Sequence, residues 1–170
     1  LLELGVDPAQ PDGDGRRAVE VAAAAGRWRL VALLDPAYAL PASVQADAGE
    51  AALPDRAPLA LLREGLEAGR YDDLERVAAL VAPAELGALL AGDGAPPTPE
   101  CVDWLLAQGA DAEACDEAGD TPLFRLLGRG PAAVPAIQAL LRHGASPAGS
   151  GGLARFLAAC VDGDQAGRAL

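Results

Sequence analysis

The apolar residues of this chain recur at helical spacing in short segments that end in glycine. Residues 102–109 read Val-Asp-Trp-Leu-Leu-Ala-Gln-Gly, and residues 137–144 read Ile-Gln-Ala-Leu-Leu-Arg-His-Gly. Apolar positions spaced i, i+3 and i+4 form one face of a helix. A following glycine readily adopts the left-handed conformation that ends it. We therefore expect each segment to be an amphipathic helix that ends at its glycine.

The positions of these glycines indicate an internal repeat. Gly109 and Gly144 are 35 positions apart. The opening residues 1–7, Leu-Leu-Glu-Leu-Gly-Val-Asp, contain a third copy, whose Gly5 precedes Gly109 by 104 positions. That interval equals three periods of about 35 residues, close to a period known from helical repeat proteins. It predicts two further repeat boundaries at which the glycine signature is eroded.

The same patterns predict paired helices along the chain. The expected pairs are 17–25 with 28–34, 57–68 with 71–82, 84–91 with 99–108, and 121–128 with 132–143. The corresponding repeat units are 12–35, 55–83, 84–111 and 116–145. A Pro-rich link at 36–54 is expected to be irregular, and a break there would give sub-stacks at 1–54 and 55–170. An opening fragment at 1–11 and a partial terminal unit at 149–170, with a helix at about 151–161, complete the order.

A second motif connects these pairs to a known family. Residues 116–124, Asp-Glu-Ala-Gly-Asp-Thr-Pro-Leu-Phe, resemble the ankyrin-repeat run D-x-x-G-x-T-P-L-H. Thr121 stands where it can cap a helix, and Pro122 suits the first helical position. Residues 12–26 contain an earlier copy. The resemblance covers nearly the whole chain and is strongest over 1–34 and 100–147. It implies an all-α, ankyrin-repeat-like solenoid of stacked helix-turn-helix pairs with short hairpin loops, irregular in the middle.

Composition narrows the classes of partner. The 170 residues carry a net charge of −12, and all thirteen basic residues are dispersed arginines. Because phosphate backbones need a basic footprint, nucleic acid is not expected as a partner. No segment is apolar enough to enter a membrane.

The low aromatic content bears on the core. Aromatic residues make up 4 % of the chain, so the core must consist of Leu, Ala and Val, a composition that favours helices.

Composition also bears on the origin of the chain. The content of Ala, Gly, Pro and Arg is typical of a GC-rich, bacterial coding genome. The sequence contains no Met and begins with Leu1, which indicates a segment of a longer protein. We expect a cytoplasmic location, although truncation would also have removed any signal peptide.

Candidate chemistry is sparse. The single histidine, His143, ends a predicted helix, and the three cysteines at 101, 115 and 160 lack the close spacing of a zinc site. Residues 12–15, Asp-Gly-Asp-Gly, faintly resemble a calcium loop, but Arg16 occupies a ligand position. Residues 149–152 lack the Lys-Ser/Thr of a phosphate loop. We therefore expect no enzymatic activity, no metal and no cofactor.

What remains is surface, and the resemblance implies that this surface binds protein. Repeat proteins bind through extended concave faces. The hairpin tips would carry Gln10, Asp12, Asp14, Glu113, Asp116 and Glu117, and the face of the first helices would carry Arg16, Glu20, Ala24 and Arg125. These tips are acidic and would attract a basic partner. The alternative is a structural spacer that positions another domain of a larger protein.

Overall fold

A computed structural model describes residues 9–46, 55–72, 74–92 and 96–148. Within these ranges the chain is all-α: its regular elements are helices, and its extended pairing is one isolated bridge between Pro11 and Arg17. By its contacts the chain divides into two compact units, Leu1–Val81 and Ala82–Leu170. The division thus falls between Val81 and Ala82, not in the Pro-rich link.

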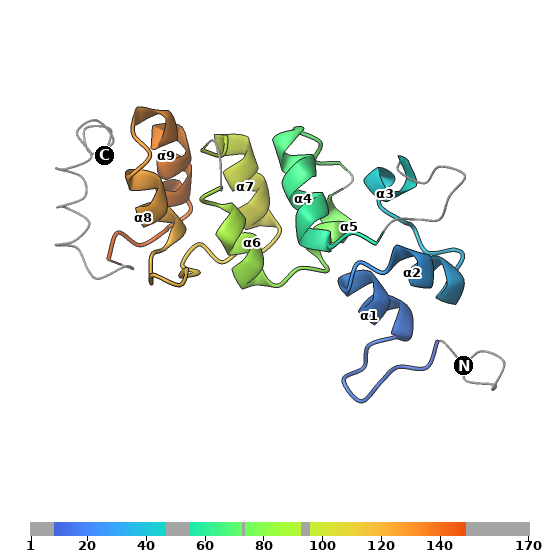
Figure 1. Ribbon diagram of the computed structural model, residues 1–170. Helices are drawn as coiled ribbons and strands as arrows, with labels where there is room; N and C mark the ends of the chain where they lie inside the picture. Colours follow the sequence, from blue (N-terminus) through green and yellow to red (C-terminus); the bar gives the residue numbers. More distant parts are fainter. Residues whose placement is uncertain (1–8, 47–54, 73, 93–95, 149–170) are drawn as a thin grey trace. The chain divides into compact units, whose positions relative to one another are not determined.

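The described residues of the first unit form five helices (Figure 1). They are α1 (Ala18–Ala24), α2 (Trp28–Leu34), α3 (Ala42–Ala46), α4 (Pro58–Glu67) and α5 (Glu75–Ala78). The helices α1 and α2 pack together as a pair, and α4 packs against α5. The Pro-rich link was expected to be irregular, but it contains α3, whose first turn is closed by the amides of Val44 and Gln45 donating to the Pro41 carbonyl.

The turn between α1 and α2 is fixed by Gly26. Its φ of +67° continues the chain after α1 in the left-handed region, and the amides of Gly26 and Arg27 donate to carbonyls of the last turn of α1. The indole Nε1 of Trp28 then donates to the carbonyl oxygen of Arg56 at 2.9 Å, and the Arg56 amide donates to the Gly26 carbonyl at 3.1 Å. The segment that leads into α4 is thereby attached to the first pair.

The helix α5 is shorter than its sequence pattern predicts. The expected helix spanned residues 71–82, whereas the structure has four residues at Glu75–Ala78. The amides of Leu80 and Val81 donate to carbonyls three residues earlier, which tightens the chain into turns. Pro83 then opens α6, and the residue before a proline is disfavoured in a helix; Ala82 is extended accordingly.

The second unit contains α6 (Pro83–Leu89), α7 (Pro99–Ala107), α8 (Pro122–Leu127), the 3₁₀-helix η2 (Pro131–Ala133) and α9 (Val134–Arg142). Contacts join α6 to α7, α8 to α9, and α7 to α9 (Figure 1). The core between them is mainly aliphatic, with Phe124 as a buried aromatic side chain. Its fully buried members include Leu90, Val102, Leu105, Leu123, Leu126, Ile137 and Leu140.

The helices α7 and α9 end in the same way. Gly109 and Gly144 have φ of +86° and +87°, and the amides of Ala110 and Ala145 donate to Leu105 and Leu140 at 3.0 Å. Both alanines are buried, at 9 % and 4 % exposure. This geometry matches the repeated signature in the sequence, and it explains why a small apolar residue follows each glycine.

Helix N-termini follow the sequence less closely. Pro122 opens α8 and Leu123 is buried, as predicted. Thr121 occupies the N-cap position but makes no capping hydrogen bond with its side chain. Thr121 is buried, with 1 % of its surface exposed. Thr98, in contrast, caps α7 with its side chain. Its Oγ1 accepts a hydrogen bond of 3.2 Å from the Cys101 amide.

Candidate interaction surface

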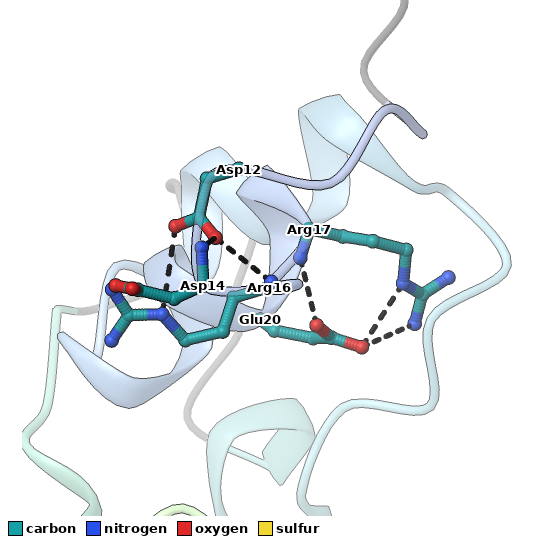
Figure 2. Close-up of polar contacts among 5 residues, drawn as sticks. All are labelled: Asp12, Asp14, Arg16, Arg17 and Glu20. Atoms are coloured by element: carbon teal, nitrogen blue, oxygen red, sulfur yellow. Dashed lines mark hydrogen bonds and ion pairs between the residues drawn. The ribbon is translucent and has the colours of Figure 1, made fainter.

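The loop before α1 is organised by the carboxylate of Asp12. Its Oδ1 accepts hydrogen bonds from the amides of Asp14 and Arg16, both at 2.9 Å. The Arg16 guanidinium lies beside both carboxylates, 3.5 Å from Oδ2 of Asp12 and 2.7 Å from Oδ2 of Asp14 (Figure 2). The side chains of Arg16 and Asp14 are both mostly exposed to solvent. The loop therefore presents charges that are mostly paired with one another.

A second paired group lies at the start of α1. The Arg17 amide donates to Oε2 of Glu20 at 2.8 Å, and the Arg17 guanidinium lies 2.9 Å from Oε1 of the same residue (Figure 2). Glu20 thus accepts a hydrogen bond from a backbone amide at the helix N-terminus. Negative charge is favoured at this end of a helix. Gln10 and Ala24, the other predicted contact residues of this unit, are exposed.

The loop between α7 and α8 reproduces the first loop in another unit. Oδ1 of Asp116 accepts from the amides of Ala118 and Asp120, both at 2.9 Å. The Asp116 amide donates to the Asp120 carbonyl, and Gly119, with φ of +79°, donates to the Asp116 carbonyl. Arg125, which is half-buried in α8, lies 3.7 Å from Oδ2 of Asp116. Asp116 and Arg125 therefore form one structural cluster.

The same loop is attached to the turn that follows α9. Oε1 of Glu113 accepts a hydrogen bond of 2.6 Å from the Ser146 amide, 33 positions later in the chain. Asp111 accepts from the Glu113 amide at 2.9 Å, and its own amide donates to the Pro83 carbonyl at 3.0 Å. Glu113 was predicted as a loop-tip residue that contacts a partner. In the structure its side chain links the loop between α7 and α8 to the turn after α9. Glu117 has no polar contact with the described part of the chain and is exposed.

The local hydrogen bonds shift three of these acids in the same direction. Hydrogen bonds to Oδ1, above all from the Arg16 amide, lower the pKa of Asp12 against a smaller effect of desolvation. The Asp120 amide is the main cause that lowers the pKa of Asp116. The Arg17 amide and side chain lower the pKa of Glu20. These carboxylates are ionised at neutral pH and accept hydrogen bonds from nearby backbone amides.

The predicted surface residues thus form two groups, one in each unit. The first contains Gln10, Asp12, Asp14, Arg16 and Glu20, and the second contains Glu113, Asp116, Glu117 and Arg125. The sequence prediction missed Arg17 and Ser146. The i, i+3 spacing of Arg17 and Glu20 was a readable signal for the first, whereas no local pattern links Ser146 to Glu113. A hollow of about 350 Å³ beside α3 contains none of the predicted residues; its lining is Leu40, Pro41, Ala42, Asp72, Glu75 and Arg76.

The candidate metal and catalytic residues form no cluster within the described part of the chain. Cys101 is buried, and burial raises the pKa of its thiol to about 11, while Cys115 is exposed. Nε2 of His143 lies 2.8 Å from Oδ1 of Asp103, which links α9 to α7. Cys160 and residues 149–152 lie outside the described ranges. Within those ranges no three His, Cys, Asp or Glu side chains gather to hold a metal ion.

Two further findings concern the class of protein. Among the helices that the structure describes, none has the length and apolar character needed to cross a bilayer. Comparison of the chain with protein-family models, with curated proteins and with solved structures gives no significant match. The geometry of the two loops is therefore the basis for any proposal about function.

Proposed function

We propose that the chain is a protein-interaction module built from ankyrin-like repeats stacked as a solenoid, with loop tips and first-helix faces as its contact surface. The observation that carries this proposal is the shared geometry of the loops at Asp12 and Asp116. They stand 104 positions apart, the same interval as Gly5 and Gly109, and fold with the same hydrogen bonds. A repeated loop followed by a helix pair supports the resemblance stated from the sequence.

Within this surface, the loop between α7 and α8 is the stronger candidate for docking. Residues 111–120 contain five acidic residues and no basic one, and Arg125 lies beside one of these acids, Asp116. In the first loop, by contrast, Arg16 and Arg17 pair with Asp14 and Glu20. A net negative loop steers a basic segment of a partner toward it. The partner that we propose is therefore a protein with an Arg- or Lys-rich segment.

The test begins with capture of binding proteins by the purified chain, followed by titration of an isolated partner with charge variants. Glu117 is the informative position, because its side chain is exposed and takes no described part in holding the loop. Glu117→Arg should weaken binding and reduce its dependence on salt. Asp14→Arg in the first loop is the matched comparison and should weaken binding less than Glu117→Arg does, because the Asp14 carboxylate is already paired with Arg16. Equal affinities of all three proteins would refute docking at the second loop.

A structural spacer is the second candidate function. It is favoured by the fact that Asp12, Glu20, Glu113 and Asp116 all accept hydrogen bonds from the chain itself. Carboxylates used in this way stabilise loops and need no partner. Replacing the segment, in the protein that contains it, by unrelated repeats of equal length separates the two ideas. Preserved function favours the spacer, and lost function favours the interaction module.

The proposal gives the segment no catalytic role. Asp12, Glu20, Glu113 and Asp116 accept hydrogen bonds from backbone amides, which is a structural use. Hydrolytic activity of the purified chain that is lost on substitution of a single carboxylate would contradict this part of the proposal.

A further inference from the structure

We draw no further inference here: the strongest candidate, the exposed apolar face of α2 formed by Leu30 and Leu33, carries none because nothing in the structure shows what covers it.

Discussion

Asp12 and Asp116 occupy the same place in two separate loops. In each loop the aspartate Oδ1 accepts from the amides two and four residues later. The amide of the aspartate also donates to the carbonyl four residues later, and its carbonyl accepts from the amide three residues later. A glycine with φ of +79° stands three residues after each aspartate. Because the side chain replaces a backbone partner in a tight turn, aspartate at this position specifies the loop, and its ionised form is the better acceptor.

The first prediction concerns acid. The pKa of Asp116 is lower in the folded chain than its ordinary value of 3.8, so the unfolded chain binds the proton more readily. The stabilising effect of Asp116 is therefore present above about pH 4 and is lost as the pH falls through the lowered folded value. Asp116→Asn keeps an acceptor oxygen but removes the titration. We expect this variant to lose less stability between about pH 5 and pH 2 than the unmodified chain, as measured by thermal unfolding.

Glu117→Gln serves as the control for that comparison. It removes one negative charge one residue away, from a side chain without a described polar contact, and should leave the pH profile almost unchanged. Asp12→Asn should repeat the effect of Asp116→Asn, because its carboxylate accepts the same bonds and its pKa is also lowered. If Asp116→Asn and Glu117→Gln alter the acid profile equally, the loop bonds do not cause the shift.

The second prediction separates two reasons for a glycine. Gly15 and Gly26 both have positive φ, of +79° and +67°. A Cβ added at Gly15 would meet nothing within 4 Å, whereas one at Gly26 would lie 2.3 Å from the Arg56 carbonyl oxygen. Gly15→Ala should therefore cost about 1 kcal/mol, for the backbone conformation alone. Gly26→Ala should cost roughly 2 kcal/mol more, because the leading segment of α4 must move.

Urea unfolding of the two variants, followed by circular dichroism, measures this difference. Both glycines lie in the first unit, so the same transition reports on both. Equal losses of unfolding free energy would show that the close approach of Gly26 to Arg56 is absent in solution.

The third prediction concerns the attachment of α4 to the first helix pair. Trp28 is fully buried, and its Nε1 donates to the Arg56 carbonyl at 2.9 Å. Trp28→Phe keeps most of the apolar volume and removes the donor, so it should cost about 1 kcal/mol for the hydrogen bond. Trp28→Ala should cost roughly 3–5 kcal/mol, because it also leaves a cavity.

Tryptophan fluorescence provides the measurement for this site. In a Trp104→Phe background Trp28 is the single tryptophan, and its emission should be blue-shifted and shift to the red on unfolding. The background substitution itself changes a side chain that is only half-buried, so it should have the smaller effect on stability. A solvent-exposed emission from the folded protein would contradict the burial of Trp28.

These contacts show how far the sequence alone could lead. The helix ends at Gly109 and Gly144 were predictable, because a capping glycine and the apolar face before it lie within one short segment. The length of α5 was not predictable. Apolar residues at helical spacing continue past Ala78, but Pro83 and the turns before it end the helix early. The short helix α3 was hidden by the prolines around it, although Pro41 directly precedes α3 and is compatible with a helix start.

Hydrogen bonds between a side chain and the backbone of a distant residue were the part that the sequence could not supply. Trp28 and Arg56 are 28 positions apart, and Glu113 and Ser146 are 33 positions apart. Each pairing depends on how one helix pair is placed beside the next segment, and no local pattern encodes that placement. For the same reason, the sequence placed acidic residues at the loop positions but could not show which of them accept hydrogen bonds from other parts of the chain.

The last prediction uses that difference to separate folding from binding. Glu113 accepts a hydrogen bond of 2.6 Å from the Ser146 amide, whereas Glu117, in the same loop and of the same charge, has no described polar contact. Glu113→Ala should lower the unfolding free energy by about 1 kcal/mol or less, since the pair is partly solvated, and Glu117→Ala should leave it unchanged. Both variants remove one negative charge, so both should weaken binding of a basic partner by a similar electrostatic amount. Glu113→Ala should also speed hydrogen exchange at the Ser146 amide, because that amide loses its acceptor. Unchanged exchange at Ser146 would show that the two turns are not joined, and Glu113 would then belong with Glu117 among the residues available to a partner.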